Sequence, residues 1–315
     1  MSRIDQALRA WEKQPTPVAT PERFELGGYG HESGNGHRES APQVQESQAA
    51  APGFSIPPAP ASPATASSNG NGAGHGAGRP VTAGHLNPDL EARLVTGGSG
   101  AVPLEQYRRL AAVLHDIQSQ QGLRTLMLTS ALPAEGKTLT TVNLALTLSE
   151  SYGRRVLVID ADLRWPSVHK AFGLANDVGL SEALYGDGRE LAITHLSPRL
   201  AVLTAGHPGV TPLAGLTSAR MSQLLDACAA QFDWVLLDTP PVGLLPDAQV
   251  LARLTRAAVF VIAAGVTPSA TVTRAIAELG ADSVIGTVLN RVEDRRIPQS
   301  GYYSRYGYGY GENRD

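Results

Sequence analysis

Residues 129–138 read Thr-Ser-Ala-Leu-Pro-Ala-Glu-Gly-Lys-Thr. An apolar run typical of a strand precedes this stretch at 125–128, and a run typical of an amphipathic helix follows it at 139–149. In a loop between a strand and a helix, backbone N–H groups converge on phosphates, a lysine reaches the outer phosphates, and the next hydroxyl binds Mg²⁺. Gly136, Lys137 and Thr138 supply these parts, so the stretch predicts a nucleotide-binding loop.

Two alanines depart from the usual composition of such a loop. The pattern G-x-x-x-x-G-K-[ST] has glycine at the position of Ala131, and Ala134 also stands where glycine is common. Because a side chain disfavours left-handed backbone, we expect both alanines to avoid positive φ. A Gly-Lys-Thr triplet also occurs in loops by chance, so the rest of the chain has to support the nucleotide site.

The composition divides the chain into four parts. The segment 14–100 is dominated by Pro, Ala, Gly, Ser, Asn and His and is poor in branched and aromatic residues, which predicts a disordered linker. Ahead of it, residues 1–13 are predicted to form a short amphipathic docking helix, or else a frayed terminus. Residues 101–295 have the composition of one folded domain, and residues 296–315 form a flexible, tyrosine-rich tail.

Charge and cysteine content limit the classes of function. The net charge is −3 and the folded part has no basic stripe, which argues against direct binding of nucleic acid. The single cysteine, Cys228, lies in an apolar helical pattern, so we expect a core residue in a reducing compartment. No run approaches about 18 apolar residues, and the first residues lack a signal region. We therefore expect a cytoplasmic protein that reaches the inner membrane through a partner.

In the folded part, short apolar runs alternate with helical patterns. The predicted strands are 125–129, 155–159, 200–203, 234–237, 258–263 and 284–289, and the predicted helices are 137–150, 217–231, 247–255 and 267–279. Because the two types alternate, the sequence predicts an α/β, P-loop NTPase-like fold with a doubly wound, mainly parallel sheet flanked by helices. Ligands of such a sheet bind at the carboxyl ends of its strands, where the loop begins.

Acidic residues follow two of the predicted strands. Asp160 and Asp162 come at the end of the second strand, and Asp238 ends the strand at 234–237. Unpaired charges are costly next to apolar strands, whereas Mg²⁺ and a phosphoryl group would compensate them. Each aspartate alone could cap a helix or turn, which is the role we expect for Asp247. Together with Lys137 and Thr138, the three acids predict an Mg-nucleotide site.

These segments resemble the bacterial tyrosine kinases in their stand-alone form from capsule and exopolysaccharide systems, the CpsD/CapB type. In that family 131–138 would be Walker A, 156–164 Walker A′ and 235–238 Walker B. Further similarity lies in Asp-Leu-Arg-Trp-Pro-Ser-Val-His at 162–169, Asp-Thr-Pro-Pro at 238–241 and Val-Leu-Asn-Arg at 288–291. The resemblance covers 104–292 and implies an ATP-dependent protein-tyrosine autokinase that regulates capsular or exopolysaccharide synthesis and export.

The resemblance also implies a set of site residues. Lys137, Asp160 and Asp162 would be catalytic, with Asp160 near the attacking hydroxyl and Asp162 supporting the metal site. Thr138 and Asp238 would hold Mg²⁺. ATP would contact Leu132, Pro133, Ala134, Glu135, Gly136, Lys137, Thr138, Leu139, Asn290 and Arg291. Asn290 would read the adenine edge and Arg291 would pack on the base, although both could equally be polar residues at a strand end.

The tail gains meaning from the same resemblance. Residues 301–311 hold five of the nine tyrosines, separated mainly by glycine. They would be autophosphorylation sites delivered to a neighbouring subunit of a homo-oligomer; the alternative is a low-complexity aromatic tail. A membrane chain-length regulator of the Wzz/CapA type would activate the kinase and a tyrosine phosphatase would reset it. The family's oligomerisation motif, Glu-x-x-Arg-x-x-Arg, is only partly kept, because Glu105 and Arg108 match but Ala111 takes the last position.

Two other functions stay open at this point. A switch ATPase of the MinD/ParA type would carry a lysine just after the position of Ala131, where this chain has Leu132. A nucleotide-gated scaffold of a membrane polysaccharide co-polymerase would bind the nucleotide without phosphorylating the tail. Phosphate on the C-terminal tyrosines would distinguish the kinase from both.

Overall fold

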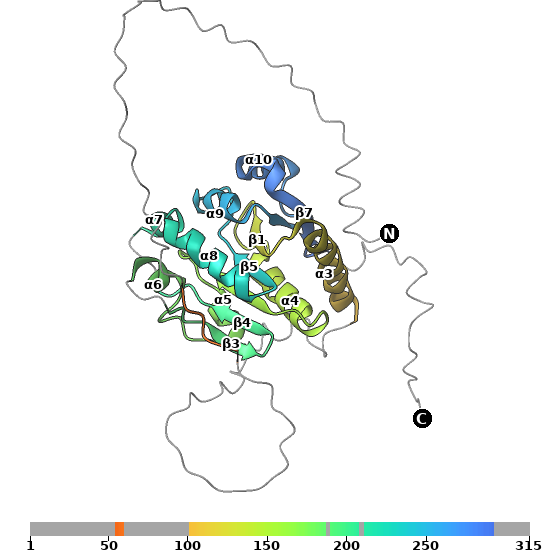
Figure 1. The fold of residues 1–315 in the computed structure, drawn as a ribbon. Helices are drawn as coiled ribbons and strands as arrows, with labels where there is room; N and C mark the ends of the chain where they lie inside the picture. The colour runs from red at the N-terminus through yellow and green to blue at the C-terminus, as the bar shows by residue number, and fades with distance from the viewer. Residues whose placement is uncertain (1–53, 60–100, 187–189, 208–210, 293–315) are drawn as a thin grey trace, which may run out of the picture.

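The computed structural model describes residues 54–59, 101–186, 190–207 and 211–292. They include one seven-stranded sheet with the order β3-β4-β2-β5-β1-β6-β7 (Figure 1). All neighbouring strands are parallel except β3 and β4, which are antiparallel. The strands are β1 (Thr125–Ser130), β2 (Val156–Asp160), β3 (Thr194–Ser197), β4 (Leu200–Leu203), β5 (Trp234–Asp238), β6 (Ala258–Ala263) and β7 (Val284–Asn290).

Helices cover both faces of this sheet. They are α3 (Ala101–Gln121), α4 (Lys137–Glu150), α5 (Val168–Phe172), α6 (Leu180–Tyr185), α7 (Pro212–Leu216), α8 (Ala219–Gln231), α9 (Asp247–Thr255), α10 (Ser269–Leu279) and a short 3₁₀ turn η1 (Ala281–Ser283). Helices α3, α4 and α5 pack on one face, and α6 to α10 pack on the other (Figure 1). None of the helices within the described residues has the length and apolar character needed to cross a membrane.

The alternation of side chains along each strand produces the two cores. The face of the sheet covered by α6 to α10 is called the α8 face below. In β1, Met127 packs on the α8 face, whereas Leu126 and Leu128 pack with α3 and α4. All five residues of β2 and of β5 are buried, as expected for central strands covered on two sides. Cys228 of α8 is fully buried and its burial raises the pKa of the thiol to about 12, which confirms that it is a core residue.

The prediction of a doubly wound, mainly parallel α/β fold is confirmed. The predicted helices at 137–150 and 247–255 and the predicted strands at 200–203 and 258–263 have the observed bounds. The sequence did not indicate α3, α5, α6, α7 or β3. Strand β3 has only four residues, all of them half-buried, so it lacks the continuous apolar run of a central strand.

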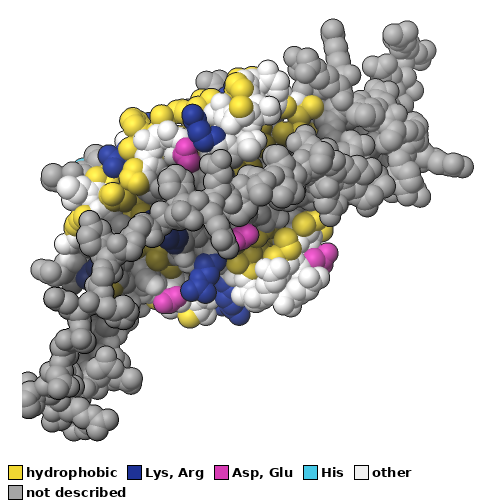
Figure 2. Space-filling view, turned by 90° about the horizontal axis from the view of Figure 1, so that it is seen from above, with side chains coloured by type: hydrophobic (Ala, Val, Ile, Leu, Met, Phe, Trp, Pro, Cys, Tyr) yellow, Lys and Arg dark blue, Asp and Glu magenta, His cyan; other side chains and the backbone are white. Residues whose placement is uncertain are grey.

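The predicted N-terminal helix at 1–13 and the tail at 296–315 lie outside the described residues. Of the predicted linker at 14–100, the structure describes only residues 54–59. Residues 54–59 lie against the domain, and Ile56 is buried among core side chains. On the face shown in Figure 2, the visible basic and acidic side chains of the described residues are interspersed among apolar and neutral ones.

Candidate active site

The phosphate loop connects the end of β1 to the first turn of α4. Gly136, directly before α4, has φ 99° and ψ 22°, in the left-handed region that favours glycine. A Cβ atom built on Gly136 would lie 1.9 Å from the side-chain nitrogen of Asn290. Any other residue at this position would therefore adopt a strained backbone conformation and would also displace the side-chain amide of Asn290.

The two alanines of the loop behave differently. Ala131 is fully buried and is absent from the residues with positive φ, as expected. Ala134 has φ 60°, so the prediction that its backbone avoids positive φ is wrong. The loop needs a left-handed residue there, and the carbonyl oxygen of Ala134 accepts a hydrogen bond from Nη2 of Arg291 at 2.5 Å. The surrounding contacts thus hold an alanine in a conformation that costs about 1–2 kcal/mol.

Glu135 fixes the shape of the loop from inside. Its side chain is buried, and Oε2 accepts a hydrogen bond from the backbone N–H of Leu132 at 2.7 Å. The other oxygen, Oε1, accepts from the backbone N–H of Ala263 at 3.2 Å and from the hydroxyl of Thr267. The loop after β1 is therefore tied to the segment that follows β6. Leu132 and Glu135 do not line the cavity described below, and the N–H of Leu132 is used inside the loop.

The end of β7 supports the same loop. The side-chain amide of Asn290 donates a hydrogen bond to the carbonyl oxygen of Glu135 at 2.9 Å. Arg291, which has φ 59°, reaches the carbonyl oxygen of Ala134. Both residues line the cavity beside the loop. In the described structure their side chains donate hydrogen bonds to carbonyl oxygens of the phosphate loop.

Thr138 and Asp238 meet at the centre of the site. The Thr138 hydroxyl donates to Oδ2 of Asp238 at 2.6 Å and lies 2.7 Å from the hydroxyl of Ser167. The Thr141 hydroxyl donates more weakly to Oδ1 of Asp238 at 3.4 Å. Asp238 is the last residue of β5, the strand next to β1, so the sheet itself places the carboxylate beside the first turn of α4.

Asp160 and Asp162 differ in their surroundings. Asp160 pairs in register with Asp238 on the neighbouring strand and is fully buried. Its Oδ2 accepts from the backbone N–H groups of Ser167 and Val168, both at 2.9 Å, where α5 begins. Asp162 is slightly exposed, lines the cavity with Lys137, and accepts from the backbone N–H of Trp165 at 3.1 Å.

The three aspartates lie in a region of excess negative charge. Burial, followed by the neighbouring charge of Asp238, raises the pKa of Asp160 well above its ordinary value. Burial also raises the pKa of Asp238 to about 6, although its hydrogen bond from Thr138 and the charge of Lys137 oppose this shift. The pKa of Asp162 is raised by burial as well. Among the described residues, no ion pair joins any of the three to a lysine or an arginine.

A cavity of about 1040 Å³ opens where these groups meet. Six of the eight predicted loop residues line it, from Pro133 to Leu139 without Glu135. It is also lined by residues that the sequence analysis did not assign: Val142, Trp165, Ser167, Lys170, Ala171, Pro241 and Leu244. Trp165 and Leu244 are exposed, at 64% and 52%, so the entrance is partly apolar. The motif at 162–169 contained Trp165 and Ser167, but nothing in their pattern indicated a cavity.

Asp247 does not have the role predicted for it. It is the first residue of α9, after Pro246, and its carboxylate pairs with the guanidinium of Arg164 at 2.8 Å. A capping residue would stand just before the helix, and its side chain would accept a hydrogen bond from a backbone N–H of the first turn. Asp247 instead lies within the helix, and its side chain is buried. The pair joins the loop after β2 to α9, on the side of the sheet opposite α4.

The donor set fits a magnesium ion bound together with phosphate. Thr138 and Asp238 present hard oxygen ligands, and a divalent cation would offset the buried negative charge. Within the described ranges, no three His, Cys, Asp or Glu side chains are grouped so as to hold a metal ion by themselves.

Comparison with known proteins identifies the relationship. The family described as the CobQ/CobB/MinD/ParA nucleotide binding domain matches residues 126–303, which is more than half of the chain. Tyrosine-protein kinase YwqD of Bacillus subtilis (strain 168) is 36% identical over 204 residues, covering 63% of this chain and 85% of YwqD. The chain belongs to the bacterial tyrosine kinase family.

Other members of the bacterial tyrosine kinase family agree with this assignment. The solved kinase domain of Escherichia coli tyrosine kinase ETK has a TM-score of 0.58 and 32% identity, covering 66% of this chain and 80% of that domain. Tyrosine-protein kinase etk of Escherichia coli (strain K12) is 34% identical over 196 residues, but the match spans 61% of this chain and only 27% of etk. The fold and the nucleotide-binding domain are thus shared, and the chain matches only a part of the longer kinases.

Proposed function

We propose that the protein is an ATP- and Mg²⁺-dependent tyrosine autokinase that phosphorylates the C-terminal tyrosines of a neighbouring copy. The targets would be Tyr302, Tyr303, Tyr306, Tyr308 and Tyr310. The observation that carries the proposal is the cavity in which the phosphate loop, Lys137 and Asp162 meet. Kinship with bacterial tyrosine kinases supports the type of reaction.

The loop binds the phosphates of ATP. The first backbone N–H groups of α4 have no partners within the helix, so those of Lys137, Thr138 and Leu139 are available to phosphate oxygens. The Lys137 ammonium neutralises charge on the β and γ phosphates. Arg291 and Asn290 line the same cavity, and we assign them to the side of the base, in addition to their hydrogen bonds to the loop.

Thr138 and Asp238 would hold Mg²⁺, with the nucleotide supplying further oxygen ligands. The ion would polarise the γ-phosphoryl group and neutralise charge as it is transferred. The Thr138 hydroxyl donates a hydrogen bond to Oδ2 of Asp238 at 2.6 Å, so the two side chains that would hold the ion are adjacent. The hydroxyl of Ser167, close to Thr138, adds another oxygen beside this position.

Asp162 is the group we assign to the tyrosine hydroxyl. Asp160 was the expected candidate, but both of its oxygens accept backbone hydrogen bonds and it does not line the cavity. In the proposed step the tyrosine oxygen forms a bond to the γ-phosphorus and the bond from that phosphorus to the bridging oxygen breaks. ADP leaves with the electron pair, and the phenol proton passes to the Asp162 carboxylate. Asp160 instead fixes the start of α5 and, through it, Ser167.

The proposal extends to the setting of the enzyme. By kinship with bacterial tyrosine kinases, phosphorylation of the tail would regulate capsular or exopolysaccharide synthesis and export. A membrane chain-length regulator would activate the kinase from the inner membrane, and a tyrosine phosphatase would reverse the modification. The protein would act in the cytoplasm as a homo-oligomer.

Mass spectrometry of the full-length chain tests the kinase function. After incubation with Mg-ATP we expect phosphate on the C-terminal tyrosines, and we expect Lys137→Met to reduce it by at least about a hundredfold. The experiment is run with and without membranes that carry the chain-length regulator. Unmodified tyrosines in both conditions would favour the nucleotide-gated scaffold, and ATP hydrolysis without tail phosphate would favour a switch ATPase.

A mixing experiment tests transfer between copies. One chain carries Lys137→Met and an intact tail; the other keeps Lys137 and has phenylalanine at all five tail tyrosines. We expect the tail of the Lys137→Met chain to be phosphorylated only in the mixture. Absence of phosphate in the mixture, when the unaltered protein labels itself, would mean that transfer occurs within one chain.

A further inference from the structure

Six residues that lie far ahead of the domain in sequence form part of its surface. Residues 54–59 read Phe-Ser-Ile-Pro-Pro-Ala, and Ser55 forms a parallel β-bridge with Glu190. The backbone N–H of Leu191 donates to the carbonyl oxygen of Ser55 at 3.1 Å. His195 donates from Nε2 to the carbonyl oxygen of Pro57 at 3.2 Å. The segment therefore runs along residues 190–195, beside β3, and is held through its main chain.

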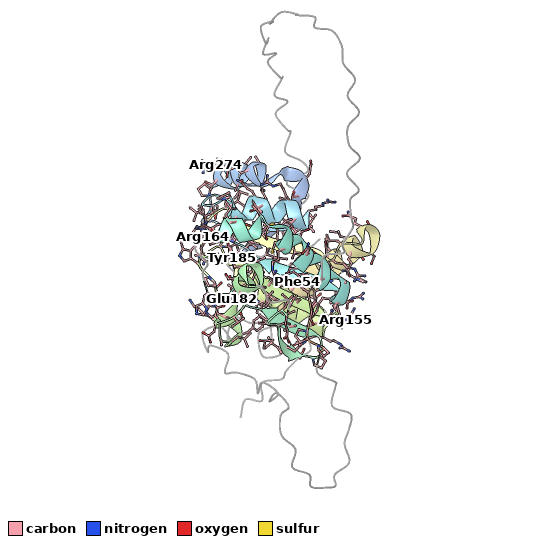
Figure 3. The ribbon with its side chains drawn as sticks, turned by 60° about the vertical axis from the view of Figure 1, so that its left-hand side comes forward. Phe54, Arg155, Arg164, Glu182, Tyr185 and Arg274 are labelled. Atoms are coloured by element: carbon pink, nitrogen blue, oxygen red, sulfur yellow. The ribbon has the colours of Figure 1, made fainter. Side chains whose placement is uncertain are left out.

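Alternate side chains of the segment face the domain. Ile56 is 8% exposed and joins the core on the α8 face, whereas Ser55 is exposed. Phe54, which is labelled in Figure 3, lies two residues before Ile56 and is half-buried. The guanidinium of Arg220 lies 5.0 Å from the centre of its ring. Arg220 also donates from Nε to the carbonyl oxygen of Ala183 at 2.5 Å, so α6 holds the cation in place. A main-chain pairing with pockets for alternate side chains is the usual mode of peptide recognition at a sheet edge.

The sequence of the segment suits this binding. A proline restricts the residue before it to extended backbone, so Pro57 limits Ile56 to the conformation that a strand requires. Pro58 restricts Pro57 in the same way. The free segment therefore already populates extended conformations, which lowers the entropy lost on docking. Its aromatic and aliphatic residues stand in a stretch otherwise rich in Pro, Ala, Ser and Gly.

We infer that the surface formed by residues 190–195, α6 and α8 is a peptide-acceptor site, and that its ligand is residues 54–59 of the same chain. The segment lies outside residues 126–303, which match the nucleotide-binding domain, whereas the acceptor surface lies within them. Docking places residues 54–59 on the α8 face, whereas α3, the next described element along the chain, packs on the opposite face of the sheet (Figure 1). This inference does not depend on whether the tail is the substrate.

Disulfide trapping in the full-length chain tests the acceptor site. Ser55→Cys and Glu190→Cys place two thiols on residues that pair in the β-bridge. The distance between paired residues of neighbouring strands lies in the range of Cα–Cα distances that a disulfide spans. The native Cys228 is fully buried with its thiol pKa raised to about 12, so it does not compete. We expect a rapid disulfide within one chain. Mixing ¹⁴N and ¹⁵N chains separates this product from a disulfide between two copies.

Matched variants connect the trapping to the observed contacts. Ile56→Asp should slow disulfide formation at least about tenfold and Phe54→Ala several-fold, because each loses a side chain that contacts the domain. Ala59→Asp, at an exposed position of the same segment, should leave the rate unchanged. Unchanged nucleotide affinity and melting temperature would show that the domain of each variant is folded. Failure of the cysteine pair to form, or equal rates for all three variants, would overturn the inference, and a mixed-isotope product would assign the site to a second copy.

Discussion

Gly136 and Asn290 are the pair in which the structure makes the sharpest prediction. Gly136→Ala places a side chain on a backbone with φ 99°, which costs about 1–2 kcal/mol. The new Cβ would also lie 1.9 Å from Nδ2 of Asn290, so the amide has to move and lose its hydrogen bond to the carbonyl oxygen of Glu135. That loss adds about 1 kcal/mol. We expect the single variant to lose about 2–3 kcal/mol of unfolding free energy.

The companion variant separates the two contributions. Asn290→Ala removes the amide and leaves only a Cβ atom, which lies 4.0 Å from the new methyl position. The single variant Asn290→Ala should lower the unfolding free energy by about 1 kcal/mol, because the hydrogen bond is lost. In the double variant the clash is absent, so the cost is the backbone strain of position 136 plus a single lost hydrogen bond to the Glu135 carbonyl. The double variant should therefore be more stable than the sum of the single changes predicts, by about 1 kcal/mol or more.

Urea unfolding of the four proteins measures this coupling, with nucleotide and Mg²⁺ removed by dialysis and chelation. A fluorescent nucleotide titration adds a second readout, in which each 1.4 kcal/mol corresponds to about tenfold in affinity. Additivity within about 0.3 kcal/mol would refute the steric account, because it would mean that Asn290 does not occupy the space beside Gly136. A near-neutral Gly136→Ala would refute the backbone account as well.

Three further predictions follow from the site and its supports. Glu135→Gln keeps the shape of the side chain but leaves one of three hydrogen-bond donors unpaired, and should cost about 1–3 kcal/mol in urea unfolding; an unchanged midpoint would contradict the role of Glu135 in fixing the loop. The folded pKa of Asp238, about 6, lies above its unfolded value, so its contribution to stability is present below pH 4 and is lost as the pH rises through 6. Without nucleotide at pH 8, Asp238→Asn should therefore have a higher melting temperature than the unaltered protein and an unfolding free energy higher by up to about 3 kcal/mol. This difference in stability should shrink towards pH 4, and the variant should bind Mg-nucleotide less tightly. A stability difference that does not change with pH would exclude ionisation of Asp238 as the cause. Ala111→Arg restores the oligomerisation motif, but Ala111 lies on the buried face of α3 and is fully buried, so the arginine should lower the unfolding free energy by more than about 3 kcal/mol; a stable variant that gains higher assemblies by light scattering would contradict this expectation.

The sequence was informative where the pattern is local. Continuous apolar runs identified β1, β2 and β5, because burial on both faces requires apolar side chains at every position. The sequence does not indicate helix α3 although it has 21 residues, because its first turn has no acidic residue and its last turn no basic residue to mark the ends of a helix. The six residues at 54–59 do not stand out in the sequence, because so short a motif hardly changes the composition of the long Pro-, Ala- and Gly-rich segment around it.

Partners distant in the chain could not be predicted from spacing. Glu135 stands in the loop as an ordinary charged residue, and its hydrogen-bond partners at Ala263 and Thr267 come more than 120 residues later. The pairing of Arg164 with Asp247 is of the same kind. Asp160 and Asp162 both follow the same apolar run, so the sequence alone does not show which of them lies at the cavity. Only the register of β2 with β5 and the start of α5 separate the fully buried Asp160 from Asp162 at the cavity.

The support of the loop by Asn290 has a consequence for how the protein is made. The loop is synthesised early, yet the amide that holds the Glu135 carbonyl follows 155 residues later, at the end of β7. Because the ribosome releases the chain from its N-terminus, a nascent chain carries the complete Gly-Lys-Thr sequence long before the loop can close around it. Nucleotide binding would thus report that β7 has joined the sheet, and a chain that ends before Asn290 would keep the motif without the site.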